Sequence, residues 1–272
     1  MPTPTPPDFC PGIAASATGP QHRLVVFGLV LAALLLCAFI AGPYLHALTT
    51  QAFADNRSLL GVPNFENVAS NLAFLLVGLG GLALCAGSQR PRALAAWRAF
   101  YLGMVLTGAG SVWYHLAPSD ATIVFDRLGM TVAFAGLAIA ILEESTHLSL
   151  TRLTLVPALL LGAASVLWWR ASGDLRPYAW VQAAPLACIA TSVLLGWVPA
   201  PMRRALVFGL ALYLLAKVVE MFDARIFDLT RHIVSGHTLK HLLAAAATSV
   251  VLLLQWQQLR ARSSHSAGSA SC

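Results

Sequence analysis

The sequence predicts an all-α integral membrane protein built as a bundle of about eight transmembrane helices. Of its 272 residues, 58% are hydrophobic and only 10% are charged, whereas a typical soluble domain carries about 25% charged residues. Several stretches approach the ~20 consecutive apolar residues that a helix needs to cross the hydrocarbon core. The net charge of +6 is spread over short loops, which is typical of membrane topology signals and argues against a nucleic-acid partner.

Composition divides the chain into three parts. Residues 1–22 are rich in Pro, Thr and Ala and are expected to be disordered, and the tail 263–272 has the same character. The polytopic membrane domain is expected at 23–262. Its first apolar segment, 24–45, is longer than the ~7–15 residues of a signal-peptide core, which favours an uncleaved helix. The five cysteines include no CxxC pair, so neither a disulfide framework nor a thiolate metal site is indicated.

Gly and Pro residues separate the apolar segments, because they commonly end helices. The predicted transmembrane helices are 24–45, 66–86, 95–117, 121–142, 153–170, 178–198, 204–223 and 236–259. Two of them carry charged residues at membrane depth, which is costly and therefore informative. The fourth contains Asp126 and Arg127, and the seventh contains Lys217 and Glu220. The last two residues lie three apart and are expected to neutralise one another.

Arginine residues predict the orientation of the bundle, because cytoplasmic loops carry an excess of Lys and Arg. One set of alternate loops is the richer: Arg23, Arg90, Arg92, Arg98, Arg152, Arg203, Arg204, Arg260 and Arg262. The opposite set is poorer: Arg57, Arg170, Arg176, Arg225 and Arg231. Both termini are therefore predicted to be cytoplasmic, and the loops after helices 1, 3, 5 and 7 are predicted to face the outer, periplasmic or lumenal, side.

A set of polar residues is expected to meet near one membrane surface. Ser111 and His115 lie four residues apart, on one face of the third helix. With a rise of ~1.5 Å per residue, Asp126 in the next helix lies as deep as Ser111, roughly 10 Å below the surface. The eighth helix begins on the same side and opens with His237 and His241. These residues therefore share one leaflet, whichever way the protein is oriented.

The residue types suit a zinc-dependent hydrolase with its site toward the outer face. His at i and i+4 on one helix face can supply two zinc ligands, as His237 and His241 would, with His115 as the third. A catalytic zinc typically has three protein ligands and keeps one position for water, whose pKa falls to about 7. Asp126 is then placed to accept a proton from that water, and Ser111 to hydrogen-bond the water or the developing oxyanion.

Two simpler interpretations stay open at this point. An unpaired carboxylate at membrane depth costs roughly 2.5–3.5 kcal/mol on insertion scales, so Asp126 would be an ion-pair partner of Arg127 or Lys240 if it had no catalytic role. His237 and His241 would then form no more than the polar start of a helix.

The same residues carry a resemblance to a known family. The run "SVWYH" at 111–115, then Asp126, then "HTLKH" at 237–241, resembles the alkaline ceramidase family. That family belongs to a wider superfamily of membrane hydrolases and receptors with a Ser–His–Asp–HxxxH zinc site. The segment "FENVASNLAFLL" at 65–76 is similar to the family's first-helix motif, and the resemblance covers about residues 64–260.

The resemblance implies an activity. It implies that a ceramide-like membrane lipid is the substrate and that its N-acyl amide bond is hydrolysed to a fatty acid and a sphingoid base. It also implies Zn²⁺ as the cofactor, with His115, His237 and His241 as ligands and Ser111 and Asp126 assisting catalysis. The alternative is a non-catalytic, lipid-binding, receptor-like protein on the same scaffold. The acyl length, the head group and the oligomeric state are not predicted.

The sequence departs from the family pattern in two places. The family is usually seven-helical, so 24–45 is expected to be an extra helix before a seven-helix core. Eukaryotic members also bind calcium through an Asp-Trp-x-Glu-x-Asn pattern and a later Glu, and this chain has "FADNRSLLGVPNFENVASN" at 53–71 instead. Ca²⁺ binding is therefore in doubt. The candidate oxygen donors for calcium, or for the border of the zinc site, are Asp55, Asn56, Asn64, Glu66 and Glu220.

Overall fold

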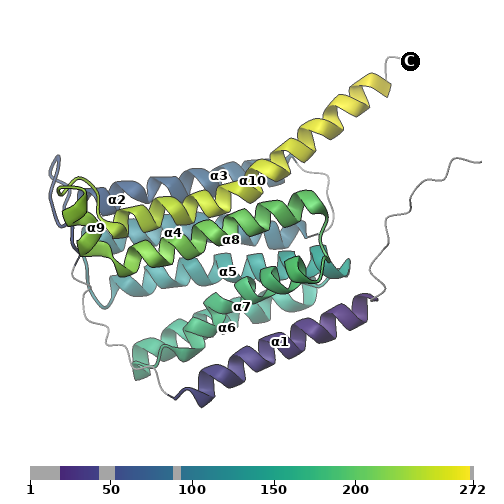
Figure 1. The fold of residues 1–272 in the computed structure, drawn as a ribbon, viewed down its shortest axis with the longest axis horizontal. Coiled ribbons are helices and arrows are strands. Elements are labelled where there is room, and N and C mark those ends of the chain that lie inside the picture. The colour runs from purple at the N-terminus through teal and green to yellow at the C-terminus, as the bar shows by residue number, and fades with distance from the viewer. Residues whose placement is uncertain (1–18, 43–52, 88–92, 270–272) are drawn as a thin grey trace, which may run out of the picture.

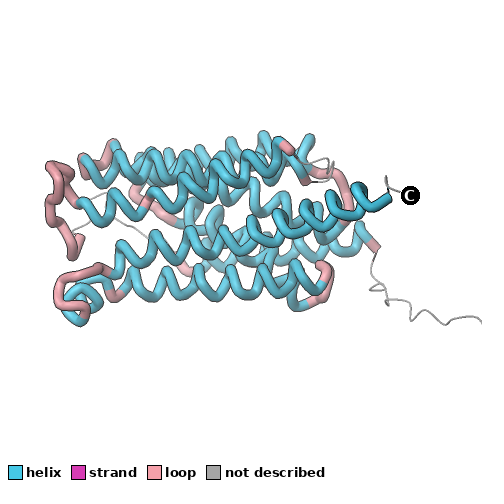
Figure 2. Tube along the Cα trace, turned by 90° about the horizontal axis from the view of Figure 1, so that it is seen from above, coloured by secondary structure: helices cyan, strands magenta, loops and turns pink. Residues whose placement is uncertain are grey.

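The computed structural model describes residues 19–42, 53–87 and 93–269. In these ranges the chain is helical and contains no strand beyond one isolated bridge between Leu59 and Val62. The long helices run along a common direction and are joined by turns at both ends of the bundle (Figures 1 and 2). The predicted all-α class is confirmed.

The helices match the predicted segments closely. Asn71 interrupts the second segment only briefly, so residues 65–86 act as one span. The elements in order are α1 (Pro20–Ile40), α2 (Phe65–Ser70), α3 (Leu72–Ala86), α4 (Leu94–Leu116), α5 (Thr122–Thr146), α6 (Thr151–Ser172), α7 (Arg176–Leu194), α8 (Ala200–Met221), α9 (Asp223–Leu229) and α10 (Gly236–Ser269).

Several of these helices identify a multi-pass membrane protein. Among the described residues, six spans are long and apolar enough to cross a membrane: α1, α2 with α3, α5, α6, α7 and α10. A seventh is added if α8 and α9, which are bent by 84° relative to one another, form one broken span. The predicted number of eight is not confirmed, because α4 is not among these spans. It carries Arg98, Ser111 and His115 together with several Gly and Ala residues.

Glycine residues bring α4 and α5 close together. A methyl group at Gly103 would lie 2.1 Å from a backbone nitrogen of α5, and one at Gly110 would lie 2.5 Å from the carbonyl oxygen of Phe125. Small residues at such positions let the backbones of membrane helices approach closely. The contact at Gly110 sets the neighbouring Ser111 on α4 at the level of Asp126 on α5.

The predicted extra helix, α1, lies at the edge of the bundle. It packs against α7 and α5 (Figure 1), and Phe27 is its buried residue, with its ring 5.2 Å from that of Trp197. The start of α1 and the end of α10 lie at the same end of the bundle (Figure 1).

The predicted terminal segments are only partly visible. Residues 1–18 lie outside the described residues, and α1 begins at Pro20, inside the segment 1–22 expected to be disordered. At the other end, α10 continues to Ser269 and so into the tail that is expected to be disordered from Ser263.

Candidate metal centre

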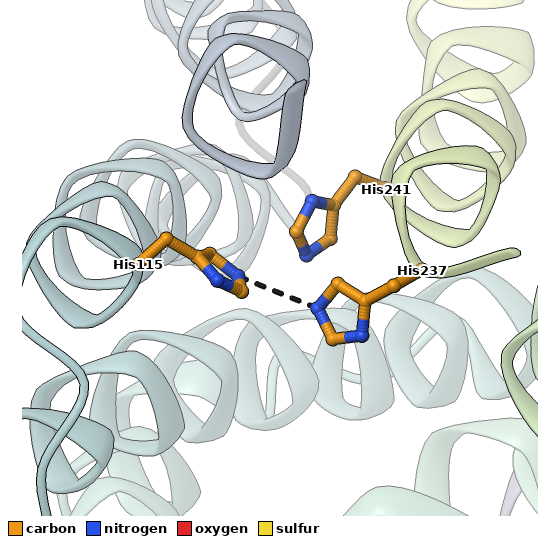
Figure 3. A group of neighbouring side chains, drawn as sticks. All are labelled: His115, His237 and His241. Carbon is orange, nitrogen blue, oxygen red and sulfur yellow. Dashed lines mark hydrogen bonds between the residues drawn. The ribbon is translucent and has the colours of Figure 1, made fainter. Parts of the chain in front are cut away.

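Three buried imidazoles gather at one end of the bundle. His115 lies in the last turn of α4, while His237 and His241 lie in the first turns of α10. One ring nitrogen of each lies within 4.8 Å of the other two, and Figure 3 shows the His115 ring facing the pair on α10. Within the described residues, no other group of three or more His, Cys, Asp or Glu is placed to hold a metal ion.

The spacing of one nitrogen pair is short enough for both atoms to bind a single metal ion. The Nε2 atoms of His115 and His237 lie 3.4 Å apart (Figure 3). Tetrahedral zinc binds imidazole nitrogens at about 2.0–2.1 Å, which places neighbouring ligands about 3.3–3.4 Å from each other. In addition, Nδ1 of His115 is buried and has no hydrogen-bond partner among the described residues. Such atoms are uncommon and often mark a functional site.

A serine fixes the ring of His241. The Ser70 hydroxyl donates its proton to the carbonyl oxygen of Asn67 at 3.1 Å. The same hydroxyl lies 2.8 Å from Nδ1 of His241 and accepts an Nδ1–H bond when that nitrogen carries the ring proton. This tautomer leaves the lone pair on Nε2, as in metal sites whose ligating histidine donates its other ring proton.

The first residues of α10 are held in place by α8 and α9. The carboxylate of Asp223 accepts the backbone N–H of His237 at 2.7 Å and that of Ala54 at 3.0 Å. It thereby satisfies one of the free N–H groups at the helix start. A methyl at Gly236 would lie 2.1 Å from the carbonyl oxygen of Val219, so only glycine lets α10 begin this close to α8.

Comparison with protein-family models and with curated proteins gives no match for this chain.

A second polar network joins α2 to the loop that precedes it and to α10. The Asn67 amide donates to the carbonyl oxygen of Asp55 at 3.0 Å, and its own oxygen accepts the Thr238 hydroxyl at 3.0 Å. The Asn64 amide donates to the carbonyl oxygen of His115 at 2.9 Å. These bonds hold the helix ends that carry the imidazoles in a fixed relation to each other.

The histidines lie at one end of a cavity of ≈ 160 Å³. Ser111 and Asp126 line the same cavity, so the structure brings together all the residues that the sequence assigns to the zinc site. Ser111 is buried, and the side chain of Asp126 is 16% exposed. The rest of the lining is mostly apolar and includes Phe100, Met104, Leu206 and Val251.

Some of the charged residues that line the cavity form the ion pairs that the sequence predicts. Lys217 contacts Glu220 at 3.2 Å, which confirms the predicted pair, and Lys240 joins them at 2.8 Å. Of the two partners considered for Asp126, Lys240 is thus bound to Glu220, and Arg127 lies at 4.0 Å. Glu220 lines the cavity, as expected for a residue that borders the site.

Lys240 also lies directly against a candidate ligand. Its ammonium nitrogen is 3.2 Å from Nε2 of His237. A cation at this distance raises the electrostatic cost of placing a divalent ion on that nitrogen, and the carboxylate of Glu220 partly offsets it. The site therefore contains a built-in opposing charge that the sequence pattern did not reveal.

Among the candidate calcium donors, the carboxylate of Asp55 is engaged by a protein partner and Asn56 is exposed. Both carboxylate oxygens of Asp55 accept hydrogen bonds from the Arg57 guanidinium, at 2.8 and 2.7 Å. Burial alone would raise the pKa of Asp55, but the hydrogen bonds and the charge of Arg57 lower this pKa below its ordinary value. The Asn64 amide is bound to His115, and Asn56 is exposed. Asp55, Glu66 and Glu220 do not form a metal group in the described part of the chain.

Sequence reasoning missed the residues that position the histidines. Ser70, Asn67 and Asp223 each bond to α10 or to an imidazole. The sequence contained a signal for two of these residues, because Asn67 and Ser70 lie three apart in "FENVASN" and so share a helix face. The partner of that face was not predictable, because it depends on how α2 packs against α10.

Proposed function

We propose that this protein is a zinc-dependent hydrolase that cleaves the amide bond of a ceramide-like lipid within the membrane. The observation that carries the proposal is the meeting of three buried imidazoles at the end of a largely apolar cavity. The proposal includes a bundle that crosses the membrane eight times, with both termini cytoplasmic and the site toward the outer face.

The chain's own residues are suited to hold the ion. His115, His237 and His241 would be its ligands, with Ser70 fixing the tautomer of His241. A zinc ion bound there would supply Lewis acidity for the carbonyl group and would lower the pKa of a water molecule to about 7.

Asp126 is placed to move protons during hydrolysis. In the overall reaction, the oxygen of a water molecule bonds to the amide carbon, the C–N bond breaks, and a proton reaches the leaving nitrogen. The products are a carboxylic acid and an amine. Asp126 lines the same cavity as the histidines and would take the water's proton and deliver it to the nitrogen. Such positioned acid–base groups typically contribute about 10²–10⁴-fold to the rate.

Ser111 is placed to stabilise developing charge. It lies on α4 one turn before His115 and lines the same cavity. Its hydroxyl would donate a hydrogen bond to the carbonyl oxygen as negative charge grows there, an effect worth about 10²–10³-fold in rate. The buried setting strengthens this bond, because water is excluded.

The apolar part of the cavity would hold the acyl chain. Phe100, Met104, Leu206 and Val251 come from α4, α8 and α10 and extend the cavity away from the histidines. A chain bound along them would present its amide to the polar end.

The test is to incubate purified, zinc-loaded protein with a membrane lipid extract and to follow amide lipids and fatty acids by mass spectrometry. We expect the loss of an amide lipid with an equal gain of fatty acid and amine, and neither change with the double variant His237→Ala, His241→Ala. If amide lipids bind to the parent protein and are recovered uncleaved, the receptor-like alternative replaces the hydrolase.

A further inference from the structure

The cavity contains more positive than negative side chains. Three cationic residues line it, Arg127, Lys217 and Lys240, against two carboxylates, Asp126 and Glu220. The imidazoles are neutral when they bind a metal. The protein thus places a net positive charge in the cavity before any divalent ion adds to it.

The three cations are not equally well paired. Lys217 and Lys240 share Glu220, at 3.2 and 2.8 Å. Arg127 faces Asp126 at 4.0 Å, the outer limit of an ion pair, and bonds the Tyr178 hydroxyl, while its buried Nε has no hydrogen-bond partner among the described residues. Of the three cations, Arg127 is therefore the one whose hydrogen-bond donors are least engaged by a carboxylate.

The guanidinium of Arg127 is nevertheless held in a defined position. It lies over the rings of Trp169 and Tyr178, at 5.7 and 5.4 Å from their centroids, and both rings are buried. Stacking of this kind is typical of arginine and orients its planar fork. A rigid and incompletely bonded fork is suited to bind an anion from outside the chain.

We propose that the lipid bound in this cavity carries an anionic head group, a carboxylate or a phosphate, which Arg127 binds. A weakly paired cation at membrane depth is costly, and an anion on the ligand lowers that cost. Guanidinium binds carboxylate and phosphate through two parallel hydrogen bonds. The proposal deepens the hydrolase assignment by naming the class of head group, and its catalytic part rests on that assignment.

The experiment compares matched lipids on the zinc-loaded full chain. N-palmitoylglycine and N-palmitoylethanolamine share the acyl chain and differ mainly in the carboxylate, and ceramide 1-phosphate and ceramide differ in the phosphate. We expect kcat/KM to be about 10- to 100-fold higher for the anionic member of at least one pair, as a hydrogen-bonded charge pair predicts. The pair that shows the preference identifies the anion.

Variants at Arg127 test the residue itself. Arg127→Gln should bring the ratio of anionic to neutral kcat/KM close to one, while Arg170→Gln, whose guanidinium bonds Asp120 outside the cavity, should keep it. Arg127→Lys, which retains the charge and loses the fork, should lower the ratio several-fold and serves if Arg127→Gln does not fold. Equal turnover of neutral and anionic lipids, or a ratio unchanged in both Arg127 variants, would overturn the proposal.

A binding measurement separates this proposal from the hydrolase assignment. Equilibrium binding of the same labelled lipids to zinc-free protein should show the anionic preference and its dependence on Arg127. If no lipid is cleaved but this preference holds, the hydrolase fails and the anionic ligand stands. If lipids are cleaved without the preference, the hydrolase assignment stands and the proposal of an anionic ligand fails.

Discussion

The histidine cluster and the loop around Asp55 are neighbouring regions that differ in how their potential metal-ligand atoms are engaged. Both contain good ligand types, and they touch, because Asn64 of the loop segment binds the carbonyl oxygen of His115. In the cluster, Nε2 atoms of two histidines face each other at 3.4 Å. In the loop, the carboxylate of Asp55 accepts three hydrogen bonds from Arg57, two of them from its guanidinium.

The difference lies in how strongly each donor is engaged, since Nε2 of His237 also has the Lys240 ammonium at 3.2 Å but no bidentate partner of the kind that binds Asp55. Asp55 is buried and fully used by Arg57, which also donates to the carbonyl oxygen of Ile233 at 3.1 Å. The loop therefore acts as a brace that ties the start of α10 to α2. It also covers the cluster, since the Phe53 ring lies 4.7 Å from that of His115 and 5.0 Å from that of His237.

The largest expected effect comes from removing a ligand. His115→Ala should lose both bound zinc and amide hydrolysis, because it deletes one of only three imidazoles in the cluster. The matched control is His232→Ala, an exposed histidine near the same membrane surface, which should retain both. Zinc content and product formation are measured on the same preparations. A His115→Ala protein with full zinc content would contradict the proposed ligand set.

A smaller effect is expected from residues of the cavity that are not ligands. Asp126→Asn should keep the zinc and lose about 10²–10⁴-fold in turnover, while Ser111→Ala should keep the zinc and lose about 10²–10³-fold. Comparing kcat at saturating lipid separates these effects from weaker binding. If Asp126→Asn hydrolyses the lipid at the parental rate, Asp126 is an ion-pair partner of Arg127 and has no role in proton transfer.

The bond that sets the tautomer of His241 should have a weaker but specific effect. Ser70→Ala removes the acceptor of the Nδ1–H bond and should weaken zinc binding about 10- to 100-fold, the usual effect of losing such a partner. Ser249→Ala removes a hydroxyl that bonds within α10 only and should leave zinc affinity unchanged. Competition with a metal chelator gives both affinities. Equal affinities in the two variants would remove Ser70 from the site.

The sequence predicted the helices and the residues of the site because both follow from periodic and local rules. Spacing of four placed Ser111 with His115 and His237 with His241, and helix direction placed Asp126 at the same level. In the structure these residues line one cavity, and the three histidines cluster within it. The predicted span at 95–117 is not among the candidate membrane spans of the described residues, and α4 combines polar residues with glycines that pack against α5.

The supporting contacts were not predictable, because they join segments far apart in the chain. Ser70 and His241 are separated by 171 residues, and Lys240 and Glu220 meet only because α8 and α10 are neighbours. The ion pair between Asp55 and Arg57 could have been predicted from the sequence, since the two residues lie only two positions apart.

The smallest expected effect concerns the Asp55 loop. Asp55→Asn should lower the free energy of unfolding by about 1–3 kcal/mol, since it weakens charge-assisted bonds, and chelation of calcium should change nothing in either protein. The pKa of Asp55 is lowered in the folded state, so its contribution is present above about pH 3.9 and is lost as the pH falls through the folded pKa. Thermal unfolding between pH 3 and 7 tests this. A large stabilisation by calcium would contradict the comparison.

The central claim is that the three imidazoles form a zinc site, and elemental analysis of purified protein tests it most directly. We predict about one zinc per chain in the parent protein, as expected for one set of three protein ligands, and none in the double variant His237→Ala, His241→Ala. Zinc at full content in that variant, or none in the parent protein after growth and purification with zinc, would contradict the account.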